Sequence, residues 1–394
     1  MWRPVNIHRF KNVIIYGKYQ TANSIITKQW IKLKIRIRVI PAPIKKEKDK
    51  FVTNQSRVTY ARDKTNQIYY EQKQIFKDII RSLHLHSLNL LRTKKEQKPL
   101  RLLYWNIQNG MWCGQDDNYE KFTTWVKQQD PDICVWCEAQ SIYKNGTADP
   151  LDSQERFLVD NWGVLAKRYG HPYWYIGGHR DNYPQVITSK YPIENIKKII
   201  GEEPNQVVTH GAGWAKIIVD EKVLNIVTLH TWPQQWAFRT EDQEASKAEN
   251  GGDKYRRMEI EYICKHTIGT STNATNEYWM MMGDFNSRNR TDNAIYRYPE
   301  DSPKFLTQDY IAQETPYVDV IAKKYPNEFK TTTGKEARID YVYCTQPLFD
   351  IIQYADVITD EYTKPVRDPK ELSNFWWPSD HRPIIIDFDL SKLK

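Results

Sequence analysis

From about Leu100 to the C-terminus, short apolar runs alternate with turn signals and helical stretches, and this alternation most constrains the fold. Many runs are apolar at successive positions, which is typical of strands covered on both faces. The runs predicted as strands are Arg101–Ile107, Ile133–Cys137, Val186–Thr188, Trp214–Val219, Val223–Leu229, Trp279–Met282, Ile339–Cys344 and Pro383–Phe388. Helices are predicted at Tyr119–Gln129, Ser153–Tyr169 and Tyr255–Thr267. Strands and helices in this order favour one α/β domain, with two packed sheets and the helices outside.

The first hundred residues differ from the rest in charge. They hold 23 Lys and Arg against 6 Asp and Glu, a net +17, whereas residues 101–394 hold 34 against 43, a net −9. We expect residues 1–98 to be a basic, poorly ordered extension with one helix at 69–91, and 99–394 to be the main folded domain. The extension is either an electrostatic arm for nucleic acid or anionic lipid, or a bland segment outside the main domain. We favour the second, because its basic residues lack the interleaved aromatic side chains of a single-strand-binding surface.

Five cysteines make an odd, sparse set, which argues against a disulfide framework. Cys134 and Cys137 fall within one predicted strand, where residues three apart point to opposite faces, so we do not expect them to share a metal. No apolar window of transmembrane length occurs, and no signal peptide is recognisable. We expect a monomer without a transmembrane segment, and the compartment stays open.

Polar residues of catalytic types stand where several predicted strands end. Asn106 ends the first strand, Glu138 follows the second, and His230 ends the strand Val227-Thr-Leu-His230. An ionised Glu at the end of an apolar strand is costly unless a cation or hydrogen-bond donors are near. Glu138 is therefore a candidate ligand for a hard metal ion, whereas His230 alone is equally compatible with a structural role.

Gly283-Asp-Phe-Asn286 follows the apolar run Trp279–Met282. In an extended exit, Asp284 and Asn286 project to the same side, so an acid and an amide converge on one point. Such a pair could hold a water molecule or a phosphate oxygen beside a metal ion without the repulsion of two carboxylates. The same tetrapeptide is also a common turn sequence, and by itself it does not decide between the two.

Asp340 lies in an otherwise apolar strand, and Asp380 and His381 come just before the last strand. A lone His is usually structural. A His with two carboxylates in reach is more specific, because one carboxylate can fix the imidazole tautomer while the other binds a metal ion.

Six short motifs, taken in order, carry a resemblance to a known family: Trp105-Asn106, Cys137-Glu138, Leu229-His230, Gly283-Asp-Phe-Asn286, Arg338-Ile-Asp-Tyr341 and Ser379-Asp-His381. The chain resembles the endonuclease/exonuclease/phosphatase superfamily, the deoxyribonuclease I-like group of metal-dependent phosphoesterases. The resemblance implies a four-layer sandwich of two packed mixed β-sheets with helices on the outer faces. It also implies Mg²⁺, with Mn²⁺ as a substitute, and hydrolysis of phosphate esters by in-line attack of water.

The resemblance also implies roles for individual residues. Glu138, Asp380 and Asn106 match the metal-site residues of the family, and Asp284 with Asn286 matches the pair that orients water and contacts the phosphate. His381 matches the catalytic imidazole, Asp340 the acid that orients it, and His230 a phosphate-contacting His of the deoxyribonuclease I and sphingomyelinase branches.

Two departures limit the choice of substrate. Gln108 stands where several DNA-repair members have Asp, and Lys335-Glu-Ala-Arg-Ile-Asp340 lacks the inositol 5-phosphatase pattern. Nucleic-acid phosphodiesters, phospholipids and small phosphoesters stay open as substrates, although the acidic catalytic region argues mildly against tight binding of a long polyanion. A non-catalytic binding module is the alternative of a different class, and the presence of every charged site residue speaks against it.

Overall fold

The computed structural model describes residues 3–10, 13–19, 34–39, 98–152, 158–178, 183–200, 208–367 and 375–393. The chain divides into two compact units, Met1–Leu91 and Arg92–Lys394. In the first unit, β1 (Arg3–Phe10), β2 (Val13–Tyr19) and β3 (Lys34–Val39) form an antiparallel sheet in that order. These strands lie in the segment expected to be poorly ordered, and the helix expected at 69–91 falls outside the described residues.

Two six-stranded mixed sheets form the centre of the second unit. The first sheet has the order β14 (Ile352–Val357), β17 (Ile384–Phe388), β4 (Leu100–Asn106), β5 (Ile133–Cys137), β7 (Gln185–Ser189) and β6 (Tyr173–Gly177). The second has the order β12 (Tyr317–Asp319), β13 (Asp340–Thr345), β11 (Tyr278–Asp284), β10 (Lys222–His230), β9 (Ala212–Val219) and β8 (Ile193–Ile199). Two short strands, β15 (Val366–Arg367) and β16 (Trp376–Trp377), form a separate hairpin.

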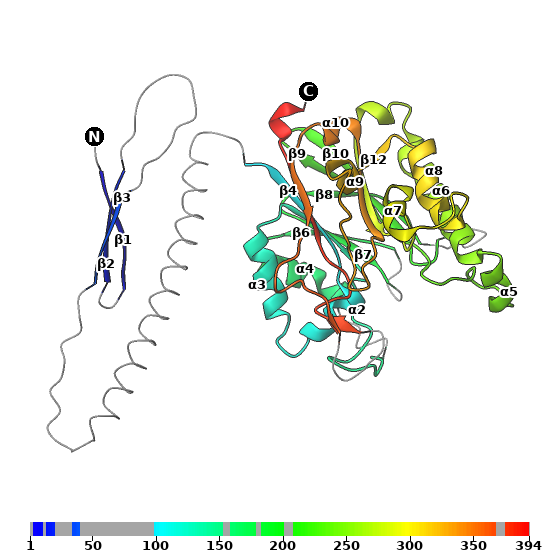
Figure 1. The fold of residues 1–394 in the computed structure, drawn as a ribbon, viewed down its shortest axis with the longest axis horizontal. Helices are drawn as coiled ribbons and strands as arrows, with labels where there is room; N and C mark the ends of the chain where they lie inside the picture. The colour runs from blue at the N-terminus through cyan, green and yellow to red at the C-terminus, as the bar shows by residue number, and fades with distance from the viewer. Residues whose placement is uncertain are drawn as a thin grey trace, which may run out of the picture. The chain divides into compact units, whose positions relative to one another are not determined.

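Helices cover the outer face of each sheet (Figure 1). The main ones are α3 (Glu120–Gln129) and α4 (Leu158–Arg168) on the first sheet, and α6 (Gly251–His266) and α8 (Leu306–Glu314) on the second. The shorter helices are α2 (Gln108–Met111), α5 (Gln243–Ala248), α7 (Asn293–Tyr296), α9 (Val320–Lys324) and α10 (Gln346–Phe349). The predicted four-layer α/β sandwich is confirmed.

The period-two alternation of strand residues explains the layers. In β4, Leu102 and Tyr104 face the core between the two sheets, whereas Leu103 and Trp105 pack under α3 and α4. In β11, Met280 and Met282 lie in that central core and Met281 packs under α6. A strand buried on both faces is apolar at most positions, and this pattern makes such runs recognisable in the sequence.

All eight predicted strands are present, and β5 has the predicted bounds Ile133–Cys137. The helix expected from Ser153 starts at Leu158 among the described residues, because 153–157 are not described. Cys134 and Cys137 lie in different cores on opposite faces of β5, and all five thiols are free. Within the described ranges, no helix has the length and apolar character needed to cross a membrane.

Candidate functional site

Strand register brings the candidate residues to neighbouring strand ends. His230, at the end of β10, pairs with Asp284 at the end of the parallel β11. Asp284 in turn pairs with Asp340, the first residue of the antiparallel β13. In the other sheet, Asn106 at the end of β4 lies beside Cys137 of β5, so Glu138 follows directly.

Glu138 and Asn106 form one side of the site. Asn106 is fully buried, and its Nδ2 donates to Glu138 Oε1 at 3.1 Å and to Asp284 Oδ2 at 3.2 Å. The backbone N–H of Asn109 donates to Glu138 Oε2 at 2.9 Å. Glu138 holds a left-handed backbone at φ 53°, which costs about 1–3 kcal/mol for a residue other than Gly, so surrounding contacts must fix it.

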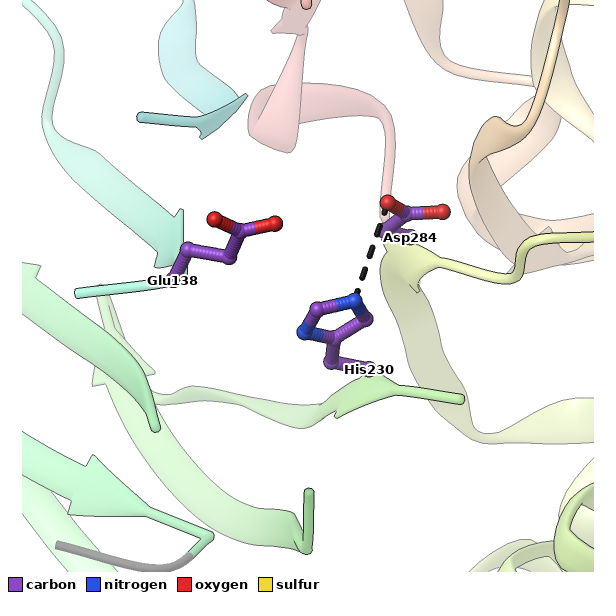
Figure 2. A group of neighbouring side chains, drawn as sticks. All are labelled: Glu138, His230 and Asp284. Atoms are coloured by element: carbon purple, nitrogen blue, oxygen red, sulfur yellow. Dashed lines mark ion pairs between the residues drawn. The ribbon is translucent and has the colours of Figure 1, made fainter. Parts of the chain in front are cut away.

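Asp284 occupies the centre of the arrangement. Its Oδ2 lies 3.8 Å from His230 Nε2 and 3.7 Å from His381 Nε2, so one buried carboxylate faces two imidazoles. Figure 2 shows Glu138, His230 and Asp284 projecting from three separate segments toward a common space. Among the residues that the structure describes, two groups have possible ligand atoms within 4.8 Å of one another: Glu138, His230 and Asp284, and Asp284, Asp340 and His381.

His381 and Asp340 form a hydrogen-bonded pair. His381 Nδ1 lies 2.7 Å from Asp340 Oδ2, and the Tyr104 hydroxyl donates to Asp340 Oδ1 at 2.7 Å. The indole of Trp105 donates to the His381 carbonyl oxygen at 2.9 Å. The imidazole is therefore held in one orientation with Nε2 directed at Asp284, at 3.7 Å, and Asp380, at 3.6 Å.

Asp380 and Asn286 lie at the margins of this cluster. The Asp380 side chain keeps 25% of its surface exposed, and Asp380 belongs to neither of the close-set groups. Asn286, at φ 47°, donates its backbone N–H to Asp284 Oδ1 at 2.9 Å and its Nδ2 to the Thr231 carbonyl at 3.1 Å. All eight sequence-predicted residues are thus gathered at one place, while the role of each stays a prediction.

The electrostatics of the site are dominated by buried carboxylates. Burial, followed by the charge of Asp380, raises the pKa of Glu138, and burial, followed by the charge of Asp340, raises that of Asp284. Although burial alone would lower the pKa of His381, the charges of Asp340 and Asp380 raise it well above its usual value. The site therefore concentrates negative charge that a cation would stabilise.

Sequence reasoning missed His210, which precedes β9. The His210 ring stacks on the His230 ring, with centroids 4.5 Å apart and an interplanar angle of 29°. It also missed Tyr104, which lies within the predicted strand Arg101–Ile107. Neither residue carries a local signal, because sheet packing alone decides their partners.

The donor set fits a hard divalent cation. Glu138, Asp284 and Asp380 supply carboxylate oxygens, the ligand type that Mg²⁺ and Mn²⁺ prefer. The side chain of Asn106 does not present its oxygen to this space, because Oδ1 accepts a hydrogen bond from the Gln108 backbone N–H at 3.0 Å and Nδ2 faces the carboxylates. In this arrangement, Asn106 holds the two acids in place.

Comparison with solved structures finds similar chains from several organisms. An AP endonuclease from Archaeoglobus fulgidus is 16% identical, covers 74% of this chain and 99% of its own, and has a TM-score of 0.49. The 3'-5' exonuclease NExo from Neisseria meningitidis is 14% identical, covers 73% and 99%, and has a TM-score of 0.48. The human Nocturnin catalytic domain is 13% identical, covers 74% and 93%, and has a TM-score of 0.47.

No curated protein matches the chain. The model of the Endonuclease/Exonuclease/phosphatase family matches residues 103–381, which include all eight candidate residues. The match spans well over half of the sequence and begins and ends within the two-sheet unit. The chain therefore belongs to the Endonuclease/Exonuclease/phosphatase family.

Proposed function

We propose that the chain is a Mg²⁺-dependent hydrolase that cleaves phosphate esters by in-line attack of water, with Mn²⁺ as a possible substitute. The observation that carries this proposal is the convergence of four carboxylates and two imidazoles at neighbouring strand ends. The carboxylates belong to Glu138, Asp284, Asp340 and Asp380. Such a concentration of acids in a protein interior costs free energy, and proteins keep it mainly at functional sites.

Glu138 and Asp380 would hold the ion, and Asn106 would fix Glu138 through its 3.1 Å hydrogen bond. When bound, Mg²⁺ supplies positive charge beside the phosphoryl oxygens. Asp284 orients and deprotonates the attacking water, because burial raises the pKa of its carboxyl and so strengthens it as a base. Asn286 would hold Asp284 through its backbone N–H. Its side chain, whose Nδ2 donates to the Thr231 carbonyl, would contact the phosphate from beside Asp284.

His381 stabilises the negative charge that gathers on the phosphoryl group. Its imidazole is oriented by Asp340 and kept protonated by the neighbouring carboxylates. His230 supplies a second contact to the phosphate. A preorganised charged donor such as His381 contributes roughly 3 kcal/mol to lowering a barrier.

A nuclease-type phosphodiester is the first candidate substrate. A phospholipid or small phosphoester is the second, and the net charge of −9 over residues 101–394 favours it, because a long polyanion binds best to a basic surface.

A panel of plasmid DNA, RNA, sphingomyelin and phosphomonoesters, each assayed with Mg²⁺ and with Mn²⁺, tests the proposal. We expect hydrolysis of at least one class, and the class identifies the substrate. A folded protein that binds these compounds but cleaves none would favour the binding-module alternative and overturn the proposal.

A further inference from the structure

We propose that His210 is a positioning residue that holds the His230 imidazole at the reaction site, and that Glu259 clamps together the two segments carrying this pair. The inference rests on the proposed function, in which His230 contacts the phosphate. It adds two residues that lie outside the six sequence motifs.

His230 lacks the polar support that His381 has. Its Nδ1 is buried and has no hydrogen-bond partner in the described part of the chain. Its Nε2 lies 3.8 Å from Asp284 Oδ2, beyond ordinary hydrogen-bond length. Because no hydrogen bond from the described residues fixes the ring, packing must set its orientation.

That packing comes from two aromatic neighbours. The His210 ring lies nearly parallel to the His230 ring, at 4.5 Å between centroids. Tyr183 stands edge-on to both, with centroids 4.8 Å from His210 and 5.9 Å from His230. Stacked and edge-to-face contacts at these distances are the favoured aromatic geometries, and together they restrict rotation of the His230 ring.

His210 is itself held through its backbone. Gln185 Nε2 donates to the His210 carbonyl at 3.1 Å and to the Tyr183 carbonyl at 3.0 Å. Gly178, at φ +68°, packs so closely that a Cβ there would lie 2.6 Å from the His210 carbonyl oxygen. A side chain at Gly178 would therefore displace His210.

Glu259 of α6 joins the segments that carry the two imidazoles. Its Oε1 accepts the backbone N–H of Thr209 at 2.8 Å and the Thr209 hydroxyl at 2.7 Å. Its Oε2 accepts the Trp232 N–H at 2.8 Å. Thr209 directly precedes His210 and Trp232 closely follows His230, so one fully buried carboxylate fixes both segments.

Arg256, one helical turn before Glu259, completes the clamp. Its Nη1 donates to the Trp232 carbonyl at 2.8 Å and to the Gln234 carbonyl at 2.9 Å. Helix α6 therefore binds the segment after His230 through both a carboxylate and a guanidinium.

A double-mutant cycle on the full-length chain tests the proposal, with the hydrolysed member of the substrate panel as probe. We expect His210→Ala to lower kcat about tenfold with little change in KM, because displacing a catalytic group by a fraction of an ångström is enough for such a loss. In a His230→Ala background the same substitution should change kcat by less than about twofold. His210→Phe, which keeps a stacking ring, should stay within about threefold of wild type.

Glu259→Gln replaces one carboxylate oxygen by an NH₂ group, which cannot accept the hydrogen bonds that Glu259 accepts from Thr209 or Trp232. We expect it to lower kcat as His210→Ala does, and to have this effect only in a chain that retains His230. His171→Phe is the matched control. His171 is a fully buried His whose ring nitrogens lie 2.9 Å from Thr188 Oγ1 and from the Pro131 carbonyl, away from the site. It should lower the melting temperature and leave kcat unchanged.

If His210→Ala lowered kcat equally in the wild-type and His230→Ala backgrounds, His210 would act independently of His230. That result would overturn this inference and leave the proposed function standing. Failure of His210→Phe to rescue would also overturn it, since a ring nitrogen would then be needed. If His230→Ala itself leaves kcat unchanged, the proposed role of His230 falls, and this inference falls with it.

Discussion

The two imidazoles beside Asp284 have opposite environments. His381 has Asp340 within hydrogen-bond distance and Asp380 nearby, and the pKa of its imidazole is raised well above the usual value. His230 stacks on another imidazole, and burial, with the charges of His210 and His381, lowers its pKa well below the usual value. Burial disfavours the charge on both rings, and only the carboxylate contacts of His381 reverse its effect. One site can therefore hold a charged and a neutral imidazole at the same pH.

The charged imidazole should matter most for turnover. We expect His381→Ala to lower kcat at least about a hundredfold, because it removes a fixed positive charge from the transition state. Steady-state kinetics on a variant shown by circular dichroism to be folded would measure this. A folded variant with near-normal turnover would refute the assignment.

The neutral imidazole should matter less. His230→Ala removes an uncharged hydrogen-bond donor, and we expect a loss of kcat of about tenfold. The ratio of the two losses, measured in one buffer and at one pH, quantifies the contrast between the rings. A larger loss for His230→Ala than for His381→Ala would reverse it.

Stability should depend on pH through the two rings with opposite sign. The folded pKa of His381 lies above the unfolded value of about 6.5. Its contribution is therefore complete below that pH and is lost as the pH rises through the folded pKa. The folded pKa of His230 lies below the unfolded value, so the folded state loses stability as the pH falls below about 6.5, where the unfolded chain binds the proton.

Denaturant unfolding in EDTA, over a pH series, measures both contributions. The difference in unfolding free energy between wild type and His381→Ala should shrink at alkaline pH, and the difference for His230→Ala should shrink at acidic pH. Each unit of pKa shift corresponds to about 1.4 kcal/mol. If the difference in unfolding free energy from wild type changed with pH in the same way for both variants, the two rings would have the same charge state.

The smallest effect should come from the N-terminal segment. All eight candidate residues lie after Leu100. Removal of residues 1–98 should therefore keep turnover and its salt dependence within about twofold of the full-length values. A raised KM for nucleic acid with a flatter salt slope would instead identify the segment as a polyanion-binding arm. Loss of the cooperative thermal transition would show that it is part of the core.

The predictable part of the fold was the part buried on both faces. Strands such as Ile133–Cys137 are apolar at every position, and such runs are visible in a sequence. The strands that were missed, including β6, β8 and β14, expose several side chains, and their mixed patterns resemble loops. These three strands, β6, β8 and β14, lie at the edges of the two six-stranded sheets, where one side of the strand is unpaired.

The residues of the candidate site also fall into those that the sequence predicts and those that it does not. Asp284 and His381 were recognisable because ionisable residues at the ends of apolar runs are unusual. Tyr104, His210 and Glu259 were not, because each acts through a partner at least 20 residues away in the sequence or in another strand. Tertiary packing creates those contacts, and no local pattern records them.

Metal dependence tests the central claim most directly. Dialysis against EDTA should abolish hydrolysis of the substrate found in the panel, and added Mg²⁺ or Mn²⁺ should restore it, because Glu138 and its neighbouring acids prefer hard cations. Glu138→Gln should require a higher Mg²⁺ concentration for half-maximal rate. Full activity of the wild-type protein in EDTA would contradict the account.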